Sequence, residues 1–250
     1  YASSLDQAGP LCKTAEDAAI LLNVMAGVDD KDSTSISLPA EDFTATLNDS
    51  LKGLRIGLPK QHFTRGLNPE IESAVRLAVA ELEKLGAEVK EIDLPNSDLA
   101  ISAYYVIAPA EASANLSRFD GVRYGYRAEG VKTLDELYKR SRSEGFGTEV
   151  QRRILLGTFV LRSGYFDAYY GKAQKARRAV QDATNADLAK VDLLISPTTP
   201  HTAFELGREA SDPTVMYLED IFTVQAPIAG LPALSLPMGL HSNGLPMGLH

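Results

Sequence analysis

The sequence has only one cysteine, Cys12, among its 250 residues. A single thiol excludes an internal disulfide and leaves no thiolate cluster for a zinc ion. We interpret Cys12 as a small buried side chain rather than as a nucleophile. Long apolar runs are also lacking, because none approaches the roughly 20 residues that a membrane-spanning helix requires. The sequence therefore predicts a soluble cytoplasmic protein without a membrane partner.

The motifs of several enzyme classes are lacking as well. The four histidines are His62, His201, His241 and His250, and none has the spacing of a metal-binding His-x-x-x-His pair. No Gly-x-Ser-x-Gly elbow, P-loop or Gly-x-Gly-x-x-Gly fingerprint occurs. The residues by themselves identify no catalytic residue and no metal site, although their polar groups can still form part of a substrate pocket.

Positive charge is in deficit, with 25 Lys and Arg residues against 33 Asp and Glu residues and a net charge of -8. This balance argues against a surface that binds polyphosphates. The hydrophobic content of 44% allows a substantial core, and the length allows one large or two small domains.

The first half of the chain contains a strand–helix–strand pattern. Residues 53–59 and 88–95 have the composition of strands. Between them, Asn68 as N-cap and Pro69 in the first turn predict the start of an amphipathic helix, which Gly86 ends. Such a crossover favours an α/β fold with a parallel or mixed sheet.

The second half is predicted to be mostly helical over residues 96–189. Residues 191–196 then form a short apolar run typical of a buried strand. Segments 234–240 and 245–249 flank Asn243-Gly244, which predicts a β-hairpin with a type I′ turn.

The run from 104 to 125 is unusual, because it begins as a small-residue helix and ends in a polar, aromatic loop punctuated by glycines. Further distinctive segments follow in a fixed order and spacing: 2–10, 152–159, 164–170, 196–200 and 229–237. Together they make the chain resemble the amidase signature family over nearly its whole length. The Arg-Phe-Asp-Gly stretch at 118–121 favours, within that family, the A subunits of bacterial glutamyl-tRNA(Gln) amidotransferases.

This resemblance implies an α/β amidase signature fold, with a mixed central β-sheet flanked by helices in α/β/α layers. The family's nucleophilic serine, second serine and lysine are set in a Gly/Ser-rich stretch that does not occur here. We therefore expect residues 1–250 to be a single partial amidase domain, the middle and later part of the subunit. The chain would then hold no catalytic residue, be inactive alone, and expose an unpaired strand edge and apolar surface that favour association.

The resemblance also indicates a substrate site. Tyr104, Arg153 and Asp220 match positions that recognise the donor glutamine in the family. A guanidinium can bind the α-carboxylate, a carboxylate the α-ammonium, and a phenol can line the pocket. Without the family, Arg153 or Arg152 would be interpreted as a solvated helix residue, Asp220 as an exposed acid beside Glu219, and Tyr104 as ordinary core.

For the intact subunit, the resemblance implies glutamine hydrolysis that supplies ammonia for making Gln-tRNA(Gln) from Glu-tRNA(Gln). The ammonia would pass to a B subunit, which would hold the tRNA and use ATP and Mg²⁺, while a small C subunit would join the two. This chain itself would need no cofactor. Two alternatives stay open, namely a stand-alone amidase acting on other amides and a non-catalytic interaction fragment.

The segment from Arg118 to Arg127 gathers several charged and aromatic residues: Arg118, Asp120, Arg123, Tyr124 and Arg127. One interpretation is an internal ion-pair network that holds the loop in place. The other is a gate or an interface with the subunit that receives ammonia. We favour the structural role, and Gly121 and Gly125 indicate a specific backbone path.

Overall fold

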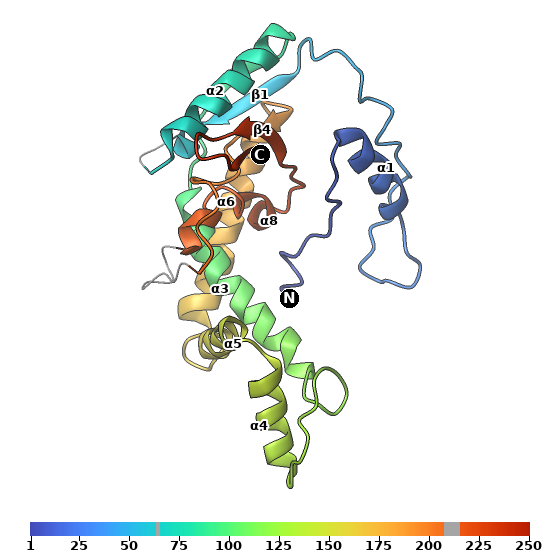
Figure 1. The fold of residues 1–250 in the computed structure, drawn as a ribbon, viewed down its shortest axis with the longest axis vertical. Helices are drawn as coiled ribbons and strands as arrows, with labels where there is room; N and C mark the ends of the chain where they lie inside the picture. Colours follow the sequence, from blue (N-terminus) through green and yellow to red (C-terminus); the bar gives the residue numbers. More distant parts are fainter. Residues whose placement is uncertain (64–65, 208–215) are drawn as a thin grey trace. The chain divides into compact units, whose positions relative to one another are not determined.

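The chain divides into two compact units in the computed structural model. One unit combines residues 1–6 with residues 53–250, and the other consists of residues 7–52 (Figure 1). The structure describes three stretches of the sequence, which are residues 1–63, 66–207 and 216–250.

The unit of residues 7–52 is built around one helix, α1 (Ala15–Met25). Thr14 caps this helix, because its Oγ1 accepts the N–H of Asp17 at 3.0 Å. Ala19 is the only fully buried residue of the unit. With so little buried surface, the unit has almost no core of its own.

Cys12 belongs to this unit and is exposed. The prediction that it is buried is therefore wrong. The segment 7–13 around it forms no helix or strand and buries none of its side chains. A small apolar side chain is buried only where neighbouring elements pack over it, and none of residues 7–52 does so here.

The larger unit contains a parallel sheet with the strand order β2-β1-β3. Its strands are β1 (Arg55–Pro59), β2 (Glu88–Ile92) and β3 (Leu193–Leu194). Ile56 of β1 lies opposite Val89 of β2 and opposite Leu193 of β3. All three predicted strands are present, although β3 is shorter than predicted.

The helix α2 (Pro69–Lys84) connects β1 to β2, after the short helical segment η1 (Lys60–His62). Asn68 caps α2 through its side-chain oxygen, as the sequence predicts. One core cluster joins the helix to the sheet and includes Val75, Val79, Ile56 and Leu58. The strand–helix–strand unit and its parallel strands are thus confirmed.

The strands β4 (Leu236–Leu240) and β5 (Pro246–Leu249) form the predicted antiparallel hairpin. The hairpin also extends the parallel sheet, because Ser196 and His250 exchange backbone hydrogen bonds of 2.9 and 2.8 Å. Pro197 pairs with Leu249 in the antiparallel sense at the same place. The sheet is therefore mixed, and the α/β prediction is confirmed.

The turn of this hairpin differs from the predicted type I′. That turn requires positive φ at both central residues, but Gly244 has it (φ 81°) and Asn243 does not. The Asn243 side chain accepts the N–H of Leu245 at 3.0 Å and donates to Thr202 Oγ1 at 3.0 Å. A tertiary contact to Thr202 thus helps to select the turn conformation.

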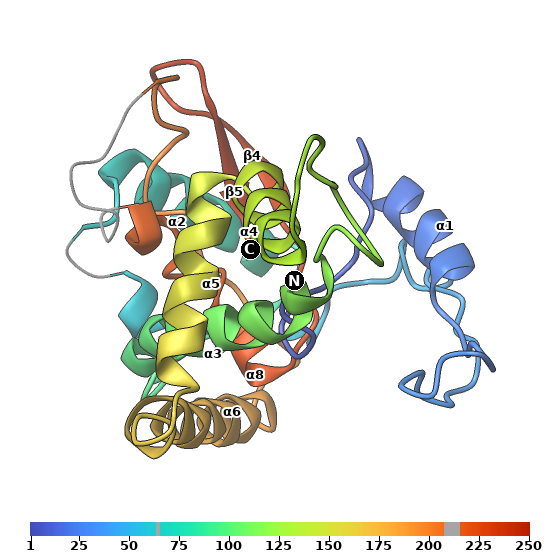
Figure 2. The same cartoon turned by 90° about the horizontal axis from the view of Figure 1, so that it is seen from below.

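A second core lies among the remaining helices of the larger unit. They are α3 (Asp98–Asn115), η2 (Leu116–Arg118), α4 (Leu134–Gly145), α5 (Thr148–Val160), η3 (Asp167–Gly171), α6 (Lys172–Leu188), η4 (Leu218–Asp220) and α8 (Gln225–Ala229). Ala103 and Ile107 of α3 pack with Val180 of α6 and Ile228 of α8. Figures 1 and 2 show α5 crossing α3, its main neighbour.

His62 gives the larger unit a pH-dependent stability. The imidazole is buried, its Nδ1 has no hydrogen-bond partner among the described residues, and its ring lies 5.2 Å from that of Phe222. Burial, with a smaller effect from His250, lowers the pKa of His62 from 6.5 to about 4. Folded His62 is therefore neutral at a pH where the unfolded chain already binds a proton.

We expect the free energy of unfolding to fall as the pH drops from 6.5 towards 4, by up to roughly 3 kcal/mol from this group. Urea denaturation across that range would measure it. In His62→Gln the free energy of unfolding should depend less on pH. In His201→Gln, which alters an exposed imidazole, the pH dependence should persist. An equal pH dependence in wild type and His62→Gln would contradict the assignment.

The outer strands of the mixed sheet are β2 and β4 in the part of the chain that the structure describes. Exposed charges on β2, Glu88 and Lys90, and Pro237 on β4 hinder pairing with another strand. Leu236 and Leu240 of β4 are nevertheless exposed. Association is thus expected to depend on apolar side chains more than on strand pairing.

Light scattering at increasing concentrations should show association of the chain, and Leu240→Lys should reduce it. The matched variant Leu77→Lys changes an exposed leucine on α2 and should have a smaller effect. A compact monomer at all concentrations would disprove this prediction.

Candidate functional site

The three predicted pocket residues come from different elements and meet in one cluster. They are Tyr104 on α3, Arg153 on α5 and Asp220 on η4. The Tyr105 hydroxyl donates to Asp220 Oδ2 at 2.7 Å, and its ring stacks on Tyr217 with the centroids 4.1 Å apart. Tyr104 packs edge-on against Tyr105 at a centroid distance of 5.1 Å.

Arg153 joins this cluster from α5. Its guanidinium carbon lies 5.5 Å from the ring centroids of both Tyr105 and Tyr217, within the range of a cation–π interaction. Its Nε donates to Glu149 Oε1 at 2.9 Å, and the Tyr217 hydroxyl donates to the same oxygen at 3.1 Å. The Arg153 side chain is 22% exposed, whereas that of Arg152 is 53% exposed. Arg153, and not Arg152, therefore belongs to the cluster.

Two groups of the cluster, Tyr105 and Arg153, keep their protons at neutral pH. Burial and the hydrogen bond to Asp220 raise the pKa of Tyr105, so its phenol remains a donor. Burial acts to lower the pKa of Arg153, but hydrogen bonds with Glu149 and the Tyr1 phenol outweigh this effect and raise it. Among the described residues no ion pair joins Arg153 to Asp220; each is held by other groups.

A cation and an anion that are close but not paired suit a zwitterionic ligand. The carboxylate of a free α-amino acid can bind a guanidinium, and its ammonium can bind a carboxylate. Tyr104, Arg153 and Asp220 are thus brought together, and each is partly buried. Their role in binding a substrate stays a prediction.

Four residues of the cluster were missed from the sequence: Tyr105, Tyr217, Glu149 and Tyr1. Glu149 precedes Arg153 by four residues on α5, a spacing that favours a helical ion pair and could have identified it. No comparable pattern marks Tyr217, because its contacts join residues more than sixty positions apart. Only the packing of α3, α5 and η4 shows its place.

Residues 1–6 are held against α3 and α6, and Tyr1 among them reaches the cluster. Ser4 donates from its N–H to Glu111 of α3 at 2.9 Å, and Arg177 of α6 donates to the Ser4 carbonyl at 2.9 Å. Asn115 donates to the carbonyl of Tyr1 at 3.0 Å. These contacts place the Tyr1 phenol beside Arg153, with which it forms a hydrogen bond.

The position of Arg153 depends on the crossing of α5 and α3. Gly157 lies at this crossing, and a Cβ there would overlap the Pro109 carbonyl and approach Ser113 Cβ within 2.7 Å. A hydrogen bond of 2.8 Å between Ser113 and Thr158 holds the helices at the same point. Arg153, one turn before Gly157 on α5, is thereby brought over the rings of Tyr105 on α3 and of Tyr217, which directly precedes η4.

Gly157→Ala should therefore destabilise the chain by at least about 2 kcal/mol, because the clash is with backbone as well as with a side chain. Gly147→Ala is the matched control, since a Cβ at Gly147 meets nothing within 4 Å. Urea denaturation of both variants would test this. Equal stability of the two would show that the crossing is not tightly packed.

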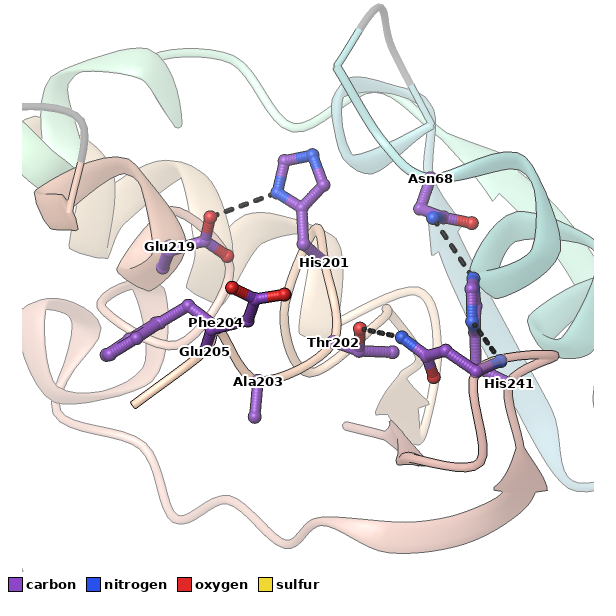
Figure 3. A pocket seen from close by; sticks show the side chains of 9 residues that line it. Asn68, His201, Thr202, Ala203, Phe204, Glu205, Glu219 and His241 are labelled. Atoms are coloured by element: carbon purple, nitrogen blue, oxygen red, sulfur yellow. Dashed lines mark hydrogen bonds and ion pairs between the residues drawn. The ribbon is translucent and has the colours of Figure 1, made fainter. Parts of the chain in front are cut away.

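A separate cavity of about 590 Å³ lies elsewhere in the larger unit (Figure 3). Its lining residues are Asn68, His201, Thr202, Ala203, Phe204, Glu205, Glu219, His241 and Asn243. His201 and Glu219 interact at 3.0 Å, and Asn68 and His241 at 3.3 Å. None of the three predicted pocket residues lines it, so this cavity does not bear on their role.

Metal-binding and membrane-spanning features can be judged for the described stretches of the chain. These stretches contain no group of three or more His, Cys, Asp or Glu side chains arranged to hold a metal ion. They also contain no helix that is both long enough and apolar enough to cross a membrane.

The sequence family described as Amidase matches residues 1–250. The chain therefore belongs to the amidase family. Over its whole length it is similar to curated A subunits of glutamyl-tRNA(Gln) amidotransferases, with 61% identity over 249 residues in Pseudomonas putida and 62% over 250 residues in Marinobacter nauticus. It covers 51% of each of them, so the chain spans about half the length of these relatives.

Solved structures agree with this family. The crystal structure of the glutamyl-tRNA(Gln) amidotransferase A subunit from Thermotoga maritima has a TM-score of 0.76 at 39% identity. The comparison covers 99% of this chain and 49% of that one. A peptide amidase from Stenotrophomonas maltophilia has a TM-score of 0.71 at 28% identity, covering 98% of this chain and 49% of its own. The shared fold is thus that of amidases with different substrates.

Proposed function

We propose that this chain is part of the glutaminase subunit of a glutamyl-tRNA(Gln) amidotransferase. The intact subunit would hydrolyse glutamine, and the ammonia would serve the ATP-dependent conversion of Glu-tRNA(Gln) to Gln-tRNA(Gln) in translation. Identities of 61 and 62% to curated A subunits support this proposal. The observation that carries it is the cluster in which Tyr105 links Arg153 to Asp220.

Glutamine would be recognised by the charges of its backbone. The Arg153 guanidinium would bind the α-carboxylate, and Asp220 would accept hydrogen bonds from the α-ammonium. Tyr105 donates to one oxygen of Asp220 and leaves the other for the ligand. Tyr104 would line the pocket beside Tyr105.

The chemical step would use groups outside these residues. In the family, one serine attacks the side-chain amide while a lysine, acting through a second serine, moves the proton. This sequence contains no such set, so residues 1–250 would be one partial amidase domain that is inactive alone. It would contribute the glutamine site and no cofactor.

The acceptor chemistry would belong to partner subunits. The net charge of -8 suits a subunit that does not itself hold tRNA. A B subunit would bind tRNA, ATP and Mg²⁺, and a C subunit would join the complex, which we place in the cytoplasm. The rival proposal is a stand-alone amidase, for which the peptide amidase fold provides a precedent. An uncharged amide, however, would make no use of the two opposite charges of Arg153 and Asp220.

The two proposals predict different kinetics for variants of the intact subunit with its partners. Arg153→Ala, Asp220→Asn and Tyr105→Phe should each weaken glutamine binding by about 1.5–3 kcal/mol, because each variant loses a hydrogen bond that involves a charged group. This raises KM for glutamine roughly 10- to 100-fold, with a smaller change in kcat. Arg152→Ala is the matched control and should leave KM nearly unchanged.

Propionamide, which has an amide but no charged groups, provides the second comparison. Under the proposal the three variants should hydrolyse it about as well as the wild type does. Similar losses of activity towards glutamine and propionamide would indicate damage to the fold. An intact subunit that does not hydrolyse glutamine would favour the stand-alone amidase. Glutaminase activity of the isolated 250-residue chain would contradict the interpretation that this chain lacks the catalytic serines and lysine.

A further inference from the structure

The loop of residues 118–127 presents large side chains to solvent. Val122, Tyr124 and Tyr126 are 50, 57 and 51% exposed. The loop follows η2 and leads towards α4, and none of its side chains takes part in the cluster around Tyr105. The exposed side chains therefore need an explanation of their own.

The backbone of this loop is held by a dense set of hydrogen bonds. Asp120 Oδ1 accepts the N–H groups of Val122 and Arg123 at 2.9 and 3.0 Å. Hydrogen bonds from the N–H groups of Arg123 and Val122 lower the pKa of Asp120 to about 2, so the carboxylate is charged at neutral pH. The Gly121 N–H donates to the Tyr124 carbonyl at 3.2 Å and closes the turn.

The helix α4 also holds the two ends of this loop through hydrogen bonds. Arg142 donates to the Leu116 and Phe119 carbonyls at 2.9 and 3.1 Å, and Ser141 Oγ accepts the N–H of Ala128 at 3.0 Å. Gly121 has φ 77°, and a Cβ there would overlap Ser141. The loop thus takes one conformation although its tip is not buried.

Such order has a cost in conformational entropy. The tip recovers little of it through burial, because Val122 and Tyr124 remain exposed. A surface that is ordered before binding loses less entropy when a partner docks. Tyrosine and arginine are also among the side chains that contribute most to interface energies.

The charge of the loop is opposite to that of the chain. Between residues 118 and 127 there are three arginines and one carboxylate, Asp120, in a chain with a net charge of -8. Arg123 pairs with Asp120 at 3.1 Å. Arg118 and Arg127 bond to the carbonyls of Asn115 and Gly121, and in the described part of the chain neither has a carboxylate partner.

We propose that the 118–127 loop is a docking surface for an acidic segment of a second polypeptide. An apolar side chain of that segment would pack between Val122 and Tyr124, and its carboxylates would pair with Arg118 and Arg127. The charges are complementary, and the loop is already in its binding conformation.

A protein segment suits this surface better than a nucleic acid does. Within the described residues only two arginines of the loop lack a carboxylate partner, too few for a phosphate backbone beside a chain of net charge -8. Val122 offers a branched aliphatic side chain, 50% exposed, which packs well against an apolar side chain of a protein segment.

Selection from a random peptide library on the immobilised chain would test this without assuming the partner. We expect enrichment of peptides that combine Asp or Glu with a large apolar residue, with affinities that fall as salt rises. The variants Val122→Ser/Tyr124→Ser and Arg118→Glu should each weaken binding of the selected peptides about tenfold or more. Leu77→Ser, which alters an exposed leucine on α2, is the matched control and should bind as the wild type does.

Thermal melting would confirm that the loop variants remain folded, since their altered side chains point to solvent. Selection of neutral or basic peptides would overturn the proposal. Selected acidic peptides that bind the loop variants as well as they bind the wild type would also overturn it. If a random RNA pool bound the chain more tightly than the selected peptides did, and the loop variants abolished that binding, the loop would be a nucleic-acid surface instead. A dimer seen by light scattering and lost in Val122→Ser/Tyr124→Ser would identify a second copy as the occupant.

Discussion

The contact between Gly157 and the Pro109 carbonyl is the constraint on which the rest of the candidate site depends. Because Gly157 has no side chain, α5 can approach the backbone of α3 at this point. Pro109 lies inside α3 and cannot donate a helical hydrogen bond to Tyr105, the residue four positions earlier. The crossing places Arg153 over the ring of Tyr105, so the geometry of the site follows from helix packing.

The site keeps two opposite charges close without letting them neutralise each other. Glu149 holds Arg153, and the Tyr105 hydroxyl holds Asp220. The Arg153 guanidinium carbon lies 5.5 Å from the ring centroids of Tyr105 and Tyr217, which stack on each other. A direct ion pair would leave both groups unable to bind a zwitterion. Partly buried charges need hydrogen-bonded partners, and here neighbouring side chains provide them while polar atoms remain for a ligand.

The family and its motifs could be predicted because they depend on residue type and spacing. The same is true of α2, which Asn68 and Pro69 begin, and of the parallel pair β1 and β2. Predictions were wrong where the outcome depends on distant residues. Cys12 is exposed because residues 7–52 bury almost nothing, and Asn243 avoids the type I′ turn while contacting Thr202.

The sequence by itself determined the α/β pattern and the family, because local periodicity and spaced motifs need no neighbours in space. The resemblance to the family then indicated Tyr104, Arg153 and Asp220 as a substrate site, a role that stays a prediction. The tertiary structure alone decided that Tyr105, Tyr217 and Glu149 complete the cluster. It also decided that the hairpin of β4 and β5 makes the sheet mixed, and that α4 orders the 118–127 loop. These contacts join residues distant in sequence, and their energies depend on packing, which no local pattern encodes.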